Sequence, residues 1–259
     1  MDYNFHTHTF RCHHASGTPE EYVLQAIDNN FKVLGFSEHI PLLLPDGQQS
    51  RYRLYVEDVQ DYVNEINSLK VKYKDKIDIK LGFEIEYYPN YFDEMLKNAK
   101  AWGAEYLILG QHFLDIEYPI YQTFYVYNKT DDLELFNSYV NLVIKGMTTG
   151  KITYVAHPDI FNYVGDKQTY QNLIRPICVE SKRLNVPLEI NMLGIRQNRI
   201  YPNEWFWEVA GQENSPVVFG SDAHEATHVF NNKTLEIAKE IVKKFKLNYI
   251  SKPNIIKLS

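Results

Sequence analysis

The segment Phe5-His6-Thr7-His8 places two histidines at the end of a short apolar run near the start of the chain. Side chains alternate across a β-strand, so the imidazoles of His6 and His8 lie on the same face and can bind one metal ion. A His-x-His pair alone is a weak signal, because histidines at this spacing are often structural. The pair gains meaning only if other strands bring similar groups to the same place.

Five further apolar runs end with a histidine or an acid. They are Phe36-Ser37-Glu38-His39, Gly82-Phe83-Glu84, Leu109-Gly110-Gln111-His112, Val155-Ala156-His157 and Gly220-Ser221-Asp222-Ala223-His224. Imidazole and carboxylate donors suit zinc, iron or manganese. The recurrence therefore predicts a metal site assembled from distant parts of the chain, as barrel enzymes do at one end of their strands.

The composition predicts one sizeable domain spanning residues 1–259. The chain has 259 residues, 44% of them hydrophobic, and a net charge of −6. Lysines and arginines are dispersed among acids, which disfavours a nucleic-acid partner. The apolar runs are too short to span a bilayer. Cys12 and Cys178 are the only cysteines, so we expect no disulfide scaffold and a cytoplasmic protein.

Short apolar runs alternate with segments of helical periodicity. Strands are expected near residues 2–6, 33–36, 77–83, 106–109, 152–156, 187–190 and 217–219. Thr18-Pro19-Glu20-Glu21 predicts a helix start in which Thr18 caps and Glu21 completes a capping box. Further helices are expected over 57–73, 91–102, 131–147, 170–184, 204–210 and 234–245. Pro176 predicts a kink or a later start in the helix over 170–184.

The alternation of strands and helices predicts parallel βαβ units, for which two architectures compete. An open doubly wound sheet gathers its site at one switch point, from a few strand ends. In a barrel, nearly every strand end contributes. Candidate ligands follow six of the seven expected strands, which favours a distorted (β/α)7 barrel, TIM-barrel-like, in a single domain. Loops over 41–55 and 115–129 are expected to cover the site.

These motifs, in this order along the chain, resemble those of the polymerase and histidinol phosphatase (PHP) superfamily. Four segments are more specifically similar to its monofunctional histidinol-phosphate phosphatases: Phe10-Arg11-Cys12-His13-His14, Ser37-Glu38-His39-Ile40-Pro41, Gly82-Phe83-Glu84-Ile85-Glu86-Tyr87 and Leu193-Gly194-Ile195-Arg196. The resemblance implies a distorted (β/α)7 barrel that binds three divalent metal ions, which could be zinc, manganese or iron.

The resemblance also implies which side chains hold each ion. The first ion would be held by His6, His8, Glu84 and Asp222, the second by Glu84, His112 and His157, and the third by His14, His39 and His224. The sequence leaves three alternatives open. His13 could replace His14, Glu86 could replace Glu84, and Cys12 could be a soft ligand or a small buried residue.

Further residues have expected roles around the metals. Glu38 is expected to act behind the ligands, and either Asp222 or Glu38 could manage the proton in catalysis. Arg196 is expected to bind phosphate, with Arg199 and then Arg11 as weaker candidates. Asp159 could orient a ligand or meet an ammonium group, although helix caps explain many such residues.

The resemblance implies hydrolysis of a phosphate monoester, L-histidinol phosphate, to L-histidinol and phosphate in histidine biosynthesis. A small cationic substrate suits an acidic protein. Two alternatives remain: another phosphoesterase of the superfamily, either a protein-tyrosine phosphatase or a nuclease-like enzyme, and a non-catalytic metal-binding module. The lack of a basic groove disfavours a nuclease, and the complete ligand set disfavours a non-catalytic module.

Overall fold

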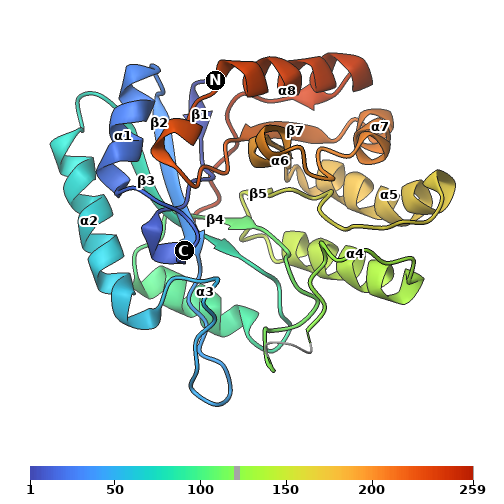
Figure 1. The fold of residues 1–259 in the computed structure, drawn as a ribbon, viewed down its shortest axis with the longest axis horizontal. Helices are drawn as coiled ribbons and strands as arrows, with labels where there is room; N and C mark the ends of the chain where they lie inside the picture. The colour runs from blue at the N-terminus through green and yellow to red at the C-terminus, as the bar shows by residue number, and fades with distance from the viewer. Residues whose placement is uncertain (120–122, 259) are drawn as a thin grey trace.

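A computed structural model describes residues 1–119 and 123–258. Its strands are parallel and form one sheet in which neighbours in space are also neighbours in sequence. Figure 1 shows the helices following one another around these strands in chain order. The strands are β1 (Tyr3–Asn4), β2 (Val33–His39), β3 (Asp78–Ile85), β4 (Tyr106–Leu109), β5 (Tyr154–Val155), β6 (Leu188–Asn191), β7 (Pro216–Gly220) and β8 (Asn248–Tyr249).

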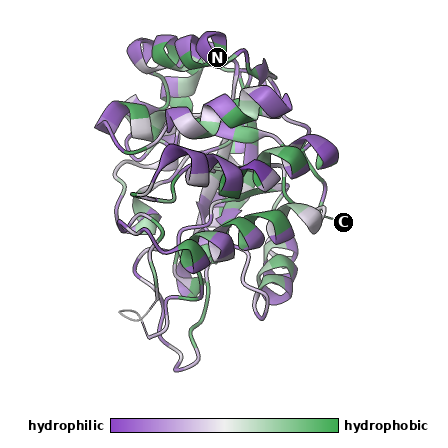
Figure 2. Ribbon diagram, turned by 90° about the vertical axis from the view of Figure 1, so that its right-hand side faces the viewer, coloured by the Kyte–Doolittle hydropathy of each residue, from purple (hydrophilic) through white to green (hydrophobic). Residues whose placement is uncertain are grey.

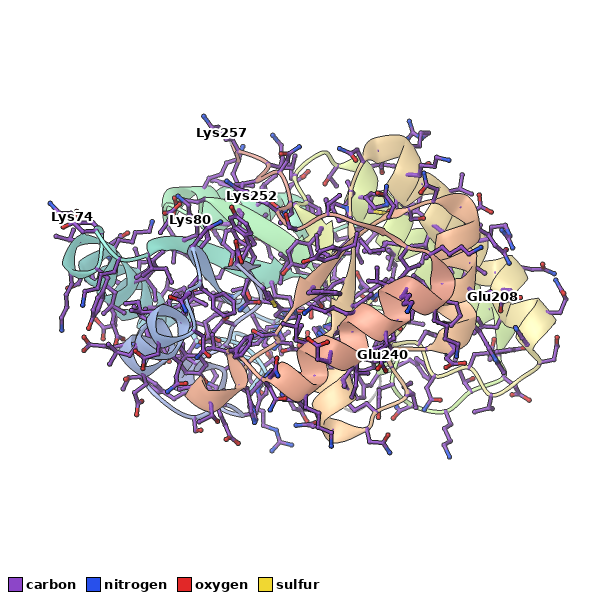
Figure 3. All side chains as sticks on the ribbon, turned by 90° about the horizontal axis from the view of Figure 1, so that it is seen from above. Lys74, Lys80, Glu208, Glu240, Lys252 and Lys257 are labelled. Atoms are coloured by element: carbon purple, nitrogen blue, oxygen red, sulfur yellow. The ribbon has the colours of Figure 1, made fainter. Side chains whose placement is uncertain are left out.

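Amphipathic helices cover the outside of the sheet. Figure 2 shows hydrophilic and hydrophobic residues alternating along them, as expected for helices with one face on the strands. Lys74, Glu240 and Lys257 project from the outer surface (Figure 3). The helices are α1 (Pro19–Asp28), α2 (Val59–Lys72), α3 (Phe92–Ala101), α4 (Leu133–Thr148), α5 (Lys167–Leu184), α6 (Met192–Gln197), α7 (Glu204–Glu213) and α8 (Asn232–Phe245).

The sheet curls until the segment after β1 meets the segment after β7. Thr7 and Ala223 form a parallel bridge, and the His8 amide donates to the Ala223 carbonyl at 2.9 Å. The predicted barrel class is therefore confirmed. The structure adds an eighth strand, β8, which pairs with the beginning of β7. Its two exposed residues are too few to show a strand period in the sequence.

Local signals located most helix starts. The Thr18 amide donates to Glu21 Oε2 at 2.6 Å, one half of the predicted capping box. A later start for α5 is wrong, because Asp166 caps this helix by accepting from the Thr169 amide at 3.0 Å, and the helix runs through Pro176. Helix α6, which the sequence did not predict, begins where Asn191 Oδ1 accepts from two backbone amides.

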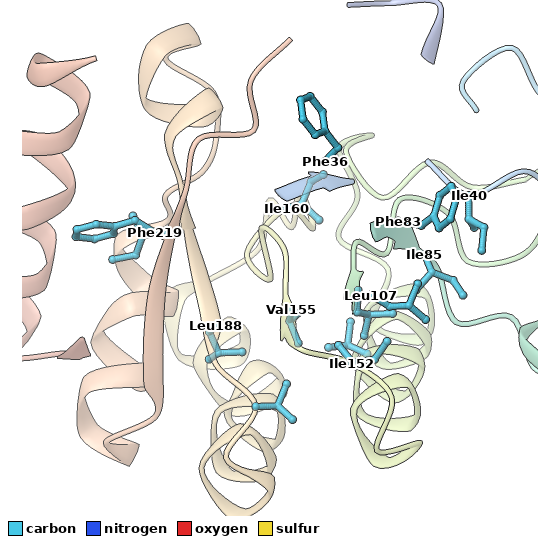
Figure 4. Packing of buried hydrophobic residues seen from close by; sticks show 14 of the residues in the cluster. Phe36, Ile40, Phe83, Ile85, Leu107, Ile152, Val155, Ile160, Leu188 and Phe219 are labelled. Atoms are coloured by element: carbon cyan, nitrogen blue, oxygen red, sulfur yellow. The ribbon is translucent and has the colours of Figure 1, made fainter. Parts of the chain in front are cut away.

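Apolar side chains pack on both faces of the strands, in two separate clusters. The larger cluster lies between strands and helices and includes Phe83 and Leu107, which are paired in register across β3 and β4 (Figure 4). The smaller cluster consists of Phe5, Val33, Tyr106, Ile108, Tyr154, Ala156 and Val218. Residues of β4 alternate between the two, Tyr106 and Ile108 in the smaller and Leu107 and Leu109 in the larger. Strands buried on both faces are typical of parallel sheets covered by helices.

Tyr106 links strands inside the smaller cluster. Its hydroxyl lies 2.8 Å from the Phe5 carbonyl and 3.0 Å from the Phe36 carbonyl, and the side chain is fully buried. The ring is therefore both a packing element and a polar tie across the barrel. A buried carbonyl that loses its donor keeps the cost of desolvation without its compensation.

We expect Tyr106→Phe to lower the free energy of unfolding by about 1–2 kcal/mol, because the one hydroxyl hydrogen that two buried carbonyls share is lost while the apolar packing is retained. Urea denaturation followed by circular dichroism measures the change. Tyr249→Phe, on the exposed strand β8, is the matched control and should have little effect. Equal stability of Tyr106→Phe and the parent would contradict this role of the hydroxyl.

Candidate metal centre

The carboxyl ends of the strands open into a cavity of about 600 Å³. Both segments expected to cover the site contribute to its wall, through Arg51, Tyr52 and Arg53 from the first and Glu117, Thr123, Tyr125 and Asn128 from the second. Residues 120–122 of the second segment lie outside the described residues. The predicted ligands that line the cavity are His8, His14, His39, Glu84, His112, His157, Asp222 and His224. His6 is fully buried beside them.

The first donor group gathers His6, His8, Glu84 and Asp222. The Nε2 atoms of the two histidines are 3.1 Å apart. Glu84 Oε2 lies 3.4 and 3.3 Å from them, and Asp222 Oδ1 lies 3.5 Å from both. Among the described residues, neither carboxylate oxygen has a hydrogen-bond partner, although both are buried. A cation between these atoms would satisfy them, so the donor set fits a divalent metal ion.

The second donor group uses the other oxygen of Glu84. Oε1 lies 3.0 Å from His157 Nε2 and 3.6 Å from His112 Nε2. The close approach of this carboxylate to β4 requires Gly110, because a Cβ there would lie 1.7 Å from Glu84 Oε1. One carboxylate thus faces two donor groups, an arrangement that suits a pair of neighbouring ions.

The third donor group contains His14, His39 and His224. The ring centroid of His14 lies 5.4 Å from that of His39 and 5.0 Å from that of His224. His14 Nδ1 lies 2.6 Å from the Cys12 carbonyl, which leaves Nε2 free for a ligand. The structure brings His14 to the site, whereas the ring of His13 packs on Tyr55 at a centroid distance of 4.1 Å.

Cys12 is buried next to this third group. Its Sγ lies within 4.8 Å of ring nitrogens of His14 and His224. The thiol therefore remains an alternative soft donor beside the histidines.

A carboxylate stands behind one histidine of each of the first two donor groups. Glu189 Oε1 lies 2.8 Å from His6 Nδ1, and Glu86 Oε1 lies 3.1 Å from His112 Nδ1. Such carboxylates orient the ring and raise the basicity of its other nitrogen. Glu86 is thus placed behind a candidate ligand.

Glu38 is a third supporting carboxylate. Its Oε2 lies 3.7 Å from His8 Nδ1, and its Oε1 accepts from the Thr9 amide at 2.6 Å. The side chain is fully buried and is not among the described residues that line the cavity. Glu38 therefore lies behind His8, on the side of the ring away from the cavity.

Glu189 is a fully buried acid beside the site that sequence reasoning missed. Besides holding His6, it accepts from the His157 amide at 3.0 Å and from Asn191 Nδ2 at 2.9 Å. Gly220 leaves room for it, since a Cβ there would lie 1.6 Å from Glu189 Oε1. A charged residue between the apolar Leu188 and Ile190 of β6 was the available signal.

Neighbouring charges strongly shift the pKa values of residues in the first donor group. Burial lowers the pKa of His8, but the adjacent Glu38 and Glu84 carboxylates outweigh it and raise this pKa to about 9. Burial by itself raises the pKa of Glu84, yet the neighbouring histidines, His6 foremost, hold it well below its ordinary value. The carboxylate is therefore ionised, and His8 carries a proton that a metal ion must displace.

The predicted phosphate ligand Arg196 lies in α6 and is turned toward the backbone. Its Nη2 donates to the Asp222 carbonyl at 2.9 Å, and it is not among the described residues that line the cavity. Arg199 does line the cavity, with Nη1 donating to the Tyr201 hydroxyl at 2.7 Å. Of the two, Arg199 is the one at the described cavity wall.

Asp159 lies away from the described cavity wall. Its Oδ2 accepts from the Asn203 amide at 2.6 Å and from Trp207 Nε1 at 2.9 Å. Burial raises its pKa to about 7. These contacts hold the start of α7 against the segment after β5, so the placement resembles the helix-capping alternative more than a contact with substrate.

A barrel with donor groups for divalent ions at the carboxyl ends of its strands defines the class of metal-dependent hydrolases built on this topology. The family model "PHP domain" matches residues 4–192. The chain therefore belongs to the PHP domain family.

Similar proteins include two curated phosphatases. A probable histidinol-phosphatase of Deinococcus radiodurans is 26% identical over 232 residues, which is 86% of each chain. The histidinol-phosphatase of Bacillus subtilis is 28% identical over 266 residues, covering 86% of this chain and 94% of that protein. The similarity thus extends over most of both sequences.

Two solved structures share the fold. Histidinol phosphate phosphatase from Lactococcus lactis, in complex with zinc, L-histidinol and phosphate, superposes with a TM-score of 0.71 at 18% identity, covering 98% of this chain and 96% of that one. A putative histidinol phosphatase from Listeria monocytogenes superposes with a TM-score of 0.67 at 20% identity, covering 90% of this chain and 98% of that one.

Among the described residues, no helix is long and apolar enough to cross a membrane.

We expect Glu189→Gln to weaken the binding of one zinc ion about 10–100-fold, because the amide keeps the shape but not the charge behind His6. Competition against a chromophoric chelator measures this affinity. Glu236→Gln, on the outer surface of α8, is the matched control and should bind zinc like the parent. Unchanged affinity in Glu189→Gln would contradict the supporting role.

We also expect zinc affinity to rise with pH. In the metal-free protein the pKa of His8 is about 9, so an ion bound below that pH displaces a proton. The apparent affinity of the first site should therefore increase at least about tenfold per pH unit between pH 6 and 8 and level off above pH 9. Chelator competition at several pH values, corrected for protonation of the chelator, provides the measurement. A flat profile would show that His8 does not ligate.

Proposed function

We propose that this protein is a phosphatase that hydrolyses L-histidinol phosphate to L-histidinol and inorganic phosphate. The observation that carries the proposal is the convergence of three donor groups at the floor of one cavity, with Glu84 between them. The curated relatives that match along most of the chain are named histidinol-phosphatase. The cavity, of about 600 Å³, is of a size suited to a small ester.

The proposed site holds three divalent ions, zinc, manganese or iron. The ligands of the first would be His6, His8, Glu84 and Asp222, those of the second Glu84, His112 and His157, and those of the third His14, His39 and His224. When bound, such ions lower the pKa of water and neutralise charge on the phosphoryl oxygens. The histidines and carboxylates supply the fixed frame that holds this charge in place.

The chain's own residues handle the proton. Asp222 lines the cavity, and its Oδ2 accepts from Asn191 Nδ2 at 3.0 Å, which orients Oδ1 toward the histidines. We assign Asp222 to proton transfer, in addition to its place among the ligands of the first ion. Glu38 acts indirectly, because it is buried behind His8 and orients that ring instead of contacting the ester.

In this proposal, Arg199 binds the phosphate group of the ester. Its guanidinium lies at the cavity wall, tied to Gln197 Oε1 at 2.8 Å and to the Tyr201 hydroxyl. Arg196 supports the backbone of Asp222 and so acts on the site indirectly. A phosphoenzyme is not part of the mechanism, since burial raises the pKa of the Cys12 thiol and keeps it protonated in the metal-free chain.

Removal of metal tests the mechanism. Dialysis against a chelator should abolish hydrolysis, and adding back zinc, manganese or iron should restore it, because the donor set offers no other source of an activated nucleophile. Phosphate release measures both steps, with metal content determined in parallel. Full activity of protein shown to be free of metal would overturn the mechanism.

A substrate panel tests specificity. We expect kcat/KM for L-histidinol phosphate to exceed that for a phosphotyrosine peptide and for a nucleoside monophosphate by at least about 100-fold, equivalent to about 2.7 kcal/mol. Equal rates on all three esters would refute the specific assignment and leave a general phosphoesterase. A protein that binds metal but hydrolyses none of them would support a non-catalytic module.

A further inference from the structure

A buried ion cluster lies between the covering segments and the second donor group. It consists of Arg53, Glu86 and Glu117, each at most 2% exposed. Arg53 Nε and Nη2 donate to the two oxygens of Glu117 at 2.9 and 3.0 Å, and Nη1 donates to Glu86 Oε2 at 2.8 Å. The bidentate geometry is the strongest that an arginine and a carboxylate can form.

The guanidinium of Arg53 is fully used by the protein. Nη1 also donates to the Ile40 carbonyl at 3.2 Å, and Nη2 lies 3.5 Å from the Tyr88 hydroxyl. An arginine has five N–H donors, and all five are engaged by these contacts. Arg53 lines the cavity but has no donor left for a phosphate, so its role is not that of an anion clamp.

The cluster is connected to a candidate metal ligand. Glu86 turns one oxygen to Arg53 and the other to His112 Nδ1, at 3.1 Å. His112 Nε2 then faces Glu84 Oε1 at 3.6 Å. Because Glu86 accepts a hydrogen bond from Nδ1 of His112, the tautomer with a free lone pair on Nε2 is favoured.

The net charge of the cluster favours positive charge at His112. One guanidinium between two carboxylates leaves one net negative charge in a buried place. Uncompensated buried charge is costly, so the cluster is best satisfied when positive charge lies at His112, as a proton or as a metal ion bound to it. A metal ion at the second group and the buried cluster therefore stabilise one another.

We propose that Arg53 is a positioning residue. Through Glu86, it fixes the orientation of His112 as a metal ligand. Through Glu117, it makes the orientation of His112 depend on both covering segments. Arg53 comes from the first segment and Glu117 from the second, while Glu86 follows β3 directly. The inference rests on the proposed metal positions but not on the identity of the ester.

Zinc titration of the metal-stripped full chain tests the proposal. Glu86→Gln should weaken one ion about 10–100-fold and leave the others unchanged. Arg53→Lys, which keeps the charge but loses the planar fork, and Glu117→Gln should weaken the same ion by a smaller factor, about three- to tenfold. Arg175→Lys is the matched control, since this arginine pairs with Glu213 on the outer surface, and it should bind like the parent.

Two further measurements separate positioning from stability. The imidazole ¹⁵N signals of His112, assigned with His112→Gln, should change on zinc binding in the parent, and the change should require more zinc in Glu117→Gln. Zinc should also slow hydrogen exchange at the backbone amides of residues 51–54, less so in Glu117→Gln, because coupling between two sites is reciprocal.

Several results would overturn the inference. One such result is that Glu86→Gln binds every ion with the affinity of the parent. Another is that its affinity for all ions falls equally, together with its free energy of unfolding. Either result would show that the cluster has only a structural role. If Glu86→Gln does not fold, Glu117→Gln decides, because it contacts no candidate ligand. A failed substrate panel would leave this titration intact, so the two proposals can fail separately.

Discussion

The Glu84 carboxylate is the group around which the site is arranged. Its Oε2 lies 3.3–3.4 Å from nitrogens of His6, His8 and His39, and its Oε1 lies 3.0 and 3.6 Å from those of His157 and His112. A buried carboxylate is unfavourable unless positive charge or hydrogen-bond donors surround it. That requirement accounts for the histidines gathered from separate strands, and for Gly110, where any side chain would collide with the carboxylate.

Behind the donor groups stands a second layer of acids. Glu189, Glu38 and Glu86 lie behind His6, His8 and His112, so that one nitrogen of each ring faces the centre and the other faces a carboxylate. Each acid has its own neutralising or donating partners, such as Arg53 for Glu86 and the Thr9 amide for Glu38. The barrel makes this layering possible, since parallel strands bring both the ligand and its support to the same end of the sheet.

Much of the fold and of the candidate site could be predicted because the relevant signals are local. The capping residues of α1, the apolar runs of β2 to β4, and the histidine or acid that ends each run are all visible within a few residues. Helix α6 and strand β8 were missed because each is too short to show a period. Arg196 and Asp159 were expected at the site, but their side-chain directions depend on contacts with Asp222, Asn203 and Trp207 that no spacing reveals.

The sequence by itself determined the class of fold and the set of metal-binding residue types, because strand periodicity and residue chemistry are properties of short segments. Only the tertiary structure decided how those residues divide into groups. The choice of His14 over His13 at the site depends on where the chain turns after Phe10–Cys12, and the role of Glu189 depends on its contact with His6, which lies 183 residues away in sequence. Distances between strands arise from packing of the whole barrel, and a site made of six strand ends acquires its geometry only when the sheet has curled far enough to bring Ala223 against Thr7.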